Sequence, residues 1–141
     1  MGCREVTSME LEPFYELEAN IVRTEEIGET PYGRRSNFHM KGTVKGKING
    51  TYEGIDYGTI VKTEVGDVVH VYVRETITTD KGIISGIRQG YAVPSKDGLA
   101  IRLFIFFHTQ IPEYRFLNWT LGVAEGKAGP EGLRLKVSLL R

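Results

Sequence analysis

The chain has 141 residues, 40% of them hydrophobic, and is long enough to bury a core without metal or disulfide support. Basic and acidic residues both number 18, and this balance argues against nucleic acid or an anionic membrane surface as a partner. The single cysteine, Cys3, and the lack of an apolar run of about 20 residues favour a reducing, cytoplasmic setting without a membrane span. We expect a tail over residues 1–12 and one domain over residues 13–141.

Strand patterns begin directly after the tail. Residues 14–24 alternate between apolar and polar side chains, with the odd-numbered residues 15–21 on the apolar face. Residues 38–48 alternate more cleanly and place lysines on a wet face. Asn49 and Gly50 then predict a type I′ hairpin, because that turn needs positive φ at both central positions.

The middle of the chain reads as a strand bent by glycine and then a long hairpin. Gly54 and Gly58 interrupt the next strand pattern, which indicates a bulge, a bend or a close backbone approach. Residues 68–78 and 83–91 are rich in β-branched and aromatic side chains, and the turn at residues 80–82 joins them.

The last third of the chain predicts three more strands. Residues 99–107 are apolar on both faces except at Arg102, which is typical of a strand covered on both sides. Residues 110–116 predict a loop with one helical turn, and residues 117–125 and 133–139 predict the final strands.

No segment has a sustained 3.6-residue period, so we expect little helix. Strands in series with short connections form a meander, and a meander of about eight strands protects its edges best by closing into an antiparallel barrel. Such a barrel encloses side chains or one small ligand. The alternative all-β fold is a two-sheet sandwich, which usually needs longer crossover connections.

Several sequence motifs resemble those of the DUF3237 (UPF0311) family, in the same order and over most of the chain. They are Gly28–Arg35, Gly42–Gly50, Gly54–Tyr57, Tyr72–Arg74, Asp80–Gly82 and Tyr114–Asn118. The resemblance implies a small calycin-like β-barrel and, since the family has no general assigned activity, leaves the function open.

The resemblance also implies three characteristic polar positions, here Asp56, Arg74 and Asn118. The sequence departs from the family pattern beside Asp56. Residues 52–54 replace the usual double glycine, and Tyr57 stands where a tryptophan is usual.

Three arginines lie at comparable depth on the three central strands: Arg74, Arg88 and Arg102. If they converge on one face, their forked donors could bind a carboxylate or phosphate. The alternative is that they lie on the solvated outer face, paired with Glu53, Glu64 or Glu75.

Asp56 is the leading candidate for chemistry, because it lies between apolar side chains in the glycine-bent strand. Desolvation in a barrel cavity would raise its pKa, and a neighbouring arginine would lower it. In either state it could serve as general acid or base. The alternative is that it merely caps a turn or bulge.

The three histidines, His39, His70 and His108, lack the spacing of a known metal motif, so we expect neither a metal nor a cofactor. His108 ends the most apolar strand, where a barrel mouth would place it as a proton-transfer partner.

Several amphipathic or aromatic side chains could line a pocket for a small organic ligand. They are Tyr57, Tyr72, Tyr91, Phe106, Asn118 and Trp119. The alternative is that they are ordinary core aromatics whose polar tips lie at the rim.

Three functions follow. The first is a cofactor-free enzyme, of the isomerase, cyclase or lyase type, in which Asp56 transfers a proton and Arg74 and Asn118 stabilise negative charge. The second is a lipocalin-like carrier or sensor of the same kind of ligand. The third is a homodimer or larger homo-oligomer that buries outward-facing Phe104 and Phe106 against a second copy.

Overall fold

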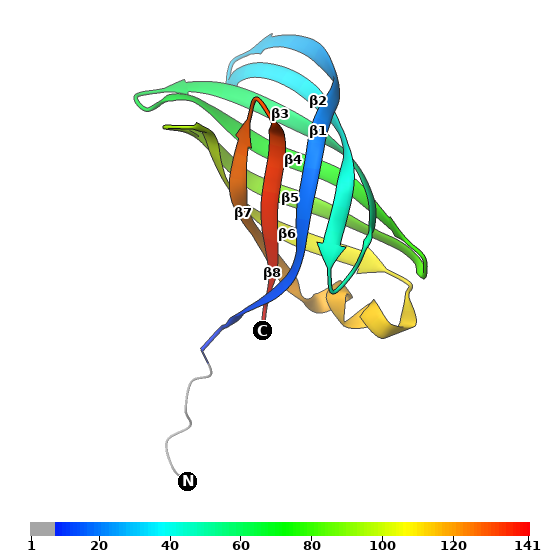
Figure 1. Ribbon diagram of the computed structural model, residues 1–141. Coiled ribbons are helices and arrows are strands. Elements are labelled where there is room, and N and C mark those ends of the chain that lie inside the picture. The colour runs from blue at the N-terminus through cyan, green and yellow to red at the C-terminus, as the bar shows by residue number, and fades with distance from the viewer. Residues whose placement is uncertain (1–7) are drawn as a thin grey trace.

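The computed structural model describes residues 8–141, which form a closed antiparallel barrel of eight strands in chain order (Figure 1). This confirms the predicted fold, and the sandwich alternative is wrong. The strands are β1 (Leu11–Thr30), β2 (Gly33–Gly46), β3 (Gly50–Thr63), β4 (Gly66–Thr79), β5 (Gly82–Ser95), β6 (Gly98–Thr109), β7 (Leu121–Gly129) and β8 (Gly132–Leu140).

Strand β1 closes the barrel by pairing with both β2 and β8. It begins at Leu11, opposite Leu140, so the last two residues of the predicted tail already belong to the sheet. Cys3 lies outside the described residues. Among residues 8–141, no helix has the length and apolar character needed to cross a membrane.

The period-2 patterns place alternate side chains in the barrel lumen. On β1, Tyr15, Leu17 and Ala19 are buried, and on β2 Met40 and Val44 are buried, as their alternation predicts. Because paired residues face the same side of a sheet, the register carries this orientation around the barrel.

Four hairpin turns share one construction. The hydroxyl of Thr30, Thr63, Thr79 or Ser95 donates to the carbonyl oxygen of the glycine three residues later, at 2.8–3.0 Å. Each of these glycines has a positive φ, from 111° to 147°, a conformation that other residues rarely adopt. These turns fix the register of the strand pairs that they join.

The β2–β3 connection differs from the predicted type I′ turn, because neither Asn49 nor Gly50 has positive φ. The Asn49 side chain instead accepts from the Gly46 N–H and donates to the Gly46 carbonyl. This wider loop turns Ile48 into the core, where its side chain is only 2% exposed. Burial of Ile48 thus overrides the local turn preference.

The predicted loop after β6 is a 3₁₀-helix, η1 (Pro112–Trp119), which is longer than the expected single turn. It lies at the end of the barrel where the β2–β3 and β4–β5 connections also lie (Figure 1), and we call this the helix end. Leu117 and Ile111 are buried there. The opposite end, which carries the other hairpins, is the hairpin end.

Candidate functional site

A cavity of about 170 Å³ occupies the lumen towards the hairpin end. Its lining is almost entirely apolar and comes from most of the strands, with Asp56, Tyr52 and Arg88 as the polar members. Aliphatic cavities of about 150 Å³ bind molecules as large as benzene, so this volume suits one small substituted ring. The apolar lining includes Ile21, Phe38, Val69, Val71, Leu99 and Leu133.

Asp56 lies in this lining with 8% of its surface exposed. Its Oδ1 accepts a hydrogen bond from the backbone N–H of Tyr72, at 3.0 Å. The β3–β4 ladder omits Tyr57 and Gly58 at this point and resumes with Thr59 opposite His70. The carboxylate therefore replaces a main-chain acceptor where the two strands lose their pairing.

An arginine from the neighbouring strand hydrogen-bonds to main-chain carbonyl groups beside Asp56. Arg35 on β2 donates to the Gly58 carbonyl, to the Ser36 carbonyl and to Asn37 Oδ1. The glycine-bent segment predicted from Gly54 and Gly58 is thus the place where two side chains take over sheet hydrogen bonds.

Burial raises the pKa of Asp56 from 3.8 to about 6, although the Tyr72 N–H and the Arg35 charge oppose the shift. A pKa close to neutral suits a group that must both accept and donate a proton under physiological conditions. Asp56 has the burial and the pKa that general acid–base chemistry requires.

A layer of buried polar side chains crosses the lumen on the helix-end side of the cavity. Arg88 and Glu75 form an ion pair, and both side chains are 1% exposed. Tyr52 Oη donates to Glu75 Oε1 at 2.8 Å, and Arg88 Nη2 donates to Tyr15 Oη at 2.6 Å. The Arg88 guanidinium also lies over the Tyr52 ring, 5.5 Å from its centroid.

The electrostatics of this layer keep Arg88 charged. Burial alone would lower the pKa of Arg88, but the neighbouring Glu75, Tyr15 and Tyr52 raise it above its usual value. Burial raises the pKa of both tyrosines well above the usual range, so both remain neutral donors or acceptors.

Two glycines make room for the layer. A Cβ at Gly54 would lie 2.8 Å from Tyr52 Oη, and a Cβ at Gly86 would lie 3.1 Å from Glu75 Oε2. Any larger residue at these positions would push the Tyr52 ring or the Glu75 carboxylate out of place.

The three predicted arginines do not converge. Arg88 is paired with Val73 and Ile105 and faces the lumen, whereas Arg74 is opposite Ile87 and Arg102 is opposite Tyr91. Arg74 and Arg102 therefore point outward, where both are exposed. The expectation of one arginine cluster is wrong because the register shifts Arg88 by one residue relative to the other two.

The alternation of inward and outward side chains also places most of the predicted aromatic and histidine site residues on the outer face. Tyr91 and Phe106 are 55% and 49% exposed, and His108 is exposed beyond them. Tyr57 and Tyr72 are half-buried on the outward side of β3 and β4, next to the lumen-facing Asp56 and Val73.

Asn118 and Trp119 lie at the helix end, away from the cavity. The Asn118 amide accepts from the Thr109 N–H and donates to the carbonyls of Thr109 and Arg115, so it ties η1 to β6. Trp119 is 78% exposed. Asp56, Arg74 and Asn118 thus do not meet in one site.

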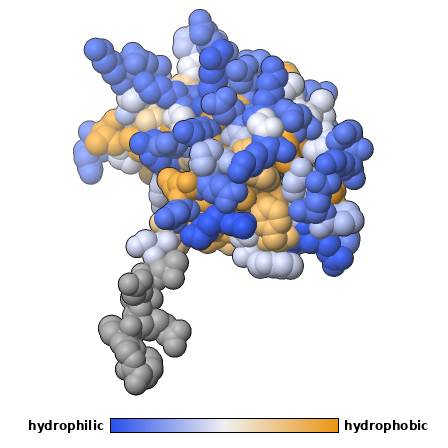
Figure 2. All heavy atoms as spheres, turned by 60° about the horizontal axis from the view of Figure 1, so that its bottom comes forward, coloured by the Kyte–Doolittle hydropathy of each residue, from blue (hydrophilic) through white to orange (hydrophobic). Residues whose placement is uncertain are grey.

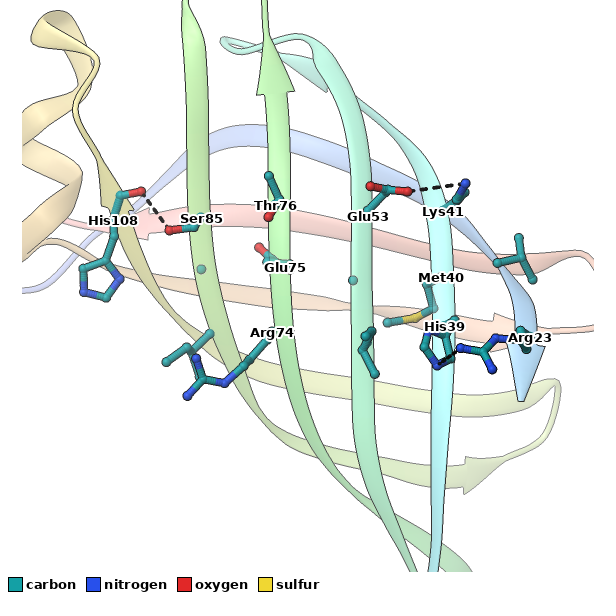
Figure 3. A pocket seen from close by; sticks show the side chains of 15 residues that line it. Arg23, His39, Met40, Lys41, Glu53, Arg74, Glu75, Thr76, Ser85 and His108 are labelled. Atoms are coloured by element: carbon teal, nitrogen blue, oxygen red, sulfur yellow. Dashed lines mark hydrogen bonds and ion pairs between the residues drawn. The ribbon is translucent and has the colours of Figure 1, made fainter. Parts of the chain in front are cut away.

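Arg74 and His108 instead line a groove of about 840 Å³ on the outer face of β1–β6 (Figure 3). His39 also lies there, in contact with Glu25 at 2.5 Å and Arg23 at 3.1 Å. This groove is larger than the internal cavity and more open to solvent. Glu75, the buried charged residue in its lining, is already paired with Arg88 and Tyr52.

The structure adds Glu75, Tyr52, Tyr15 and Arg35 to the residues around the site. Glu75 had a signal in the sequence, because it breaks an alternating row of Val69, Val71, Val73 and Ile77. A charge on the apolar face of a strand indicates a buried partner. The sequence offers Glu75 as a possible partner of the arginines on the outer face, and only the register places the Glu75–Arg88 pair in the lumen.

Solved structures share this architecture. A β-barrel-like protein from Acinetobacter baumannii AYE is 20% identical, with 97% of this chain and 99% of that chain covered and a TM-score of 0.86. A protein of unknown function from Clostridium acetobutylicum ATCC 824 is 22% identical, with 97% and 100% covered and a TM-score of 0.84. A chain described as an enzyme from Penicillium herquei is 16% identical, with complete coverage of both chains and a TM-score of 0.72.

At these identities the likeness concerns the fold alone. No curated protein matches this chain. The model of one family, however, matches residues 9–140, which is nearly the whole sequence and agrees with the resemblance in the motifs. The chain therefore belongs to the DUF3237 family, which is described as a family of proteins of unknown function.

Proposed function

We propose that this barrel binds a small apolar or aromatic molecule in the 170 Å³ cavity and that Asp56 transfers a proton to or from it without a cofactor. The observation that supports this is a buried carboxyl group, with a pKa of about 6, in an otherwise apolar cavity. Isomerisation, cyclisation and elimination all need such an acid or base next to an apolar substrate.

Placing a carboxyl group in an apolar lining is unfavourable for folding unless the group is fully paired. Asp56 has one backbone donor, Tyr72, and its other oxygen has no protein hydrogen bond among residues 8–141. One carboxylate oxygen therefore caps the gap in the β3–β4 ladder, and the other is left to meet a ligand in the cavity, as a general acid or base requires.

A carrier or sensor is the alternative, and it needs the cavity but not the carboxyl group. Such a protein gains from an entirely apolar lumen, since a buried Asp weakens both folding and the binding of an apolar ligand. The position of Asp56 therefore favours the enzyme over the carrier.

The binding part is tested by titrating the protein with isopropylbenzene and following methyl resonances by NMR. We expect shifts at Val69, Val71 and Leu99, which line the cavity, and none at Val137 and Leu139, which lie in the filled half. The matched control is Ala92→Leu, which fills the cavity and should abolish the shifts. Shifts confined to outer-face residues would contradict the proposal.

The catalytic part is tested with compounds retained during expression in cells. Native mass spectrometry followed by extraction should find a different compound on Asp56→Asn than on the wild type, namely the unconverted substrate. A carrier would retain the same compound in both, and that result would leave binding intact but remove catalysis.

A second candidate is self-association through the outer face of β5–β7. Phe104 and Phe106 point outward and are 54% and 49% exposed, as this hypothesis requires. Phe104 also lines an outer groove of about 420 Å³ together with Tyr91 and Val123. Apolar patches reach the surface between charged side chains (Figure 2). Analytical ultracentrifugation over a dilution series tests this second candidate by measuring the oligomeric state of the wild type and of Phe104→Ser. A wild-type protein that is monomeric at every concentration would exclude self-association.

A further inference from the structure

Arg88 makes fewer hydrogen bonds than a buried guanidinium normally does. Its Nε donates to Glu75 and its Nη2 donates to Tyr15. Its Nη1 is fully buried and has no hydrogen-bond partner among the described residues 8–141. Buried donors are nearly always paired, so an unpaired one beside a cavity calls for an acceptor.

The charge of the layer indicates which kind of acceptor. Glu75 already neutralises Arg88, and both lie out of contact with water. A ligand carboxylate or phosphate would add an unbalanced negative charge next to Asp56 in an apolar cavity, which is strongly unfavourable. An uncharged oxygen, by contrast, satisfies the donor without this penalty.

The register places the two polar groups along one line. Asp56 on β3 is opposite Val73 on β4, and Val73 is opposite Arg88 on β5, so all three face the lumen in one row. Neighbouring strands lie about 5 Å apart, and the backbones of Asp56 and Arg88 are therefore about 10 Å apart. A single substituted ring can bridge that span.

From these observations we infer that the ligand of this cavity is an uncharged carbonyl compound. Its oxygen accepts from Arg88 Nη1, its apolar body fills the space between the strands, and Asp56 faces the part of the molecule next to the carbonyl group. This inference rests on the proposed function and adds the chemical class of the ligand.

Three probes of similar shape separate the possibilities. Acetophenone carries a carbonyl group, isopropylbenzene has a methyl group in place of the carbonyl oxygen, and benzoate carries a negative charge. We expect acetophenone and isopropylbenzene to bind and benzoate to bind at least about tenfold more weakly than acetophenone. Benzoate binding as tightly as acetophenone would overturn the inference.

The wild-type protein alone gives the direct test. The ¹³C resonance of carbonyl-labelled acetophenone should move downfield on binding, and its carbonyl stretch should fall in frequency, relative to the same compound in an alkane. Both changes report a hydrogen bond from a charged donor. An unshifted carbonyl in the bound state would overturn the inference, even if Nη1 proved to hold a water molecule.

A variant pair supplies the energetic test. Arg88→Met combined with Glu75→Gln removes both charges together, and it should weaken acetophenone binding about tenfold or more while isopropylbenzene changes by less than about twofold. Arg102→Met is the matched control, because Arg102 is 71% exposed on the outer face, and should change neither. Equal weakening of both probes would count against a carbonyl contact.

The probes distinguish failure of the proposed function from failure of the carbonyl inference. If neither acetophenone nor isopropylbenzene binds, the cavity is not a binding site and the proposed function fails. If isopropylbenzene binds in the cavity and acetophenone binds with an unshifted carbonyl, the proposed function stands and this inference fails. Should the double variant not fold, the wild-type spectra still decide.

Discussion

The two halves of the barrel lumen differ in how completely they are filled. Towards the helix end, Phe14, Ile77, Phe107 and Leu117 are at most 4% exposed. The Phe14 ring packs edge-on against Phe107, with centroids 6.3 Å apart. Towards the hairpin end, the lining side chains Val69, Val71, Leu99, Ala128 and Leu133 are only partly buried.

The difference is one of packing more than of side-chain type. Aromatic and aliphatic residues fill the helix end, whereas the hairpin end is lined by leucine and isoleucine as well as by valine and alanine and still contains a cavity. The Arg88–Glu75 layer separates the two halves. We therefore expect packing to stabilise the filled half more strongly, and the proposed function uses the space that remains in the other half.

The largest loss of stability is expected from a substitution in the Arg88–Glu75 layer. Glu75→Ala leaves the buried Arg88 charge without its partner, and we expect a loss of about 3–5 kcal/mol in the free energy of unfolding. The control is Glu125→Ala, which removes an exposed partner of Arg102 and should lose less than about 1 kcal/mol. Urea unfolding measures both, and similar losses would mean that the layer does not stabilise the fold.

The next largest effect is expected from shortening one leucine side chain in each half of the lumen. Leu117→Ala at the helix end opens a hole in a fully buried position, and we expect a loss of about 2–5 kcal/mol. Leu99→Ala enlarges an existing cavity at a partly buried position and should lose about 1 kcal/mol. Equal losses would show that the two halves are packed alike.

The pH dependence of stability tests the hairpin end through Asp56. Its pKa rises from 3.8 to about 6 on folding, so between these values the folded state binds more protons than the unfolded state. Stability should therefore fall by about 2–3 kcal/mol as the pH rises from about 4 to about 6, and stay lower above that.

Asp56→Asn should remove this dependence and be more stable than the wild type at pH 7.5. The exposed Asp97→Asn is the matched control and should follow the wild type. Urea unfolding at pH 4.5 and 7.5 measures the effect. A wild-type protein that gains stability over this range would mean that burial does not dominate at Asp56.

The smallest effect is expected from one substitution made in each half. Val44→Leu adds a methylene group to a 1%-exposed position and should lose about 1–3 kcal/mol by overpacking. Val71→Leu extends into the cavity and should be neutral or stabilising by up to about 1 kcal/mol. Thermal unfolding compares them, and a Val71→Leu loss as large as that of Val44→Leu would mean that the cavity cannot accept added atoms.

The sequence predicts the architecture well because period-2 alternation and short turns are local signals. The closed eight-stranded barrel and the inward faces of β1 and β2 are confirmed. The type I′ turn predicted at Asn49-Gly50 is wrong and the predicted single helical turn is too short, because Ile48 and Leu117 are buried at the barrel end. Such tertiary contacts leave no local pattern.

The site is only partly predictable for the same reason. Asp56 and Arg88 do face the lumen together, as their inclusion among the candidates requires. Arg74 faces solvent on β4, where the alternation of Val71 and Val73 already assigns the faces. Arg102 and His108 on β6 face solvent, because β6 carries apolar side chains such as Phe104 and Phe106 on its outer face as well. Alternation cannot assign the faces of such a strand, and only the register to its neighbours does so. The functional roles of all these residues stay predictions.

The Tyr72 amide gives the barrel a built-in indicator of the state of its cavity. Its proton is held by a side chain, Asp56 Oδ1, at a place where the strands themselves do not pair. Any event that changes the charge or position of that carboxyl group, whether protonation or the arrival of a ligand, changes the hydrogen bond of one backbone amide. A single resonance in an ordinary amide spectrum therefore monitors the candidate site, with no label on the ligand and no knowledge of the reaction.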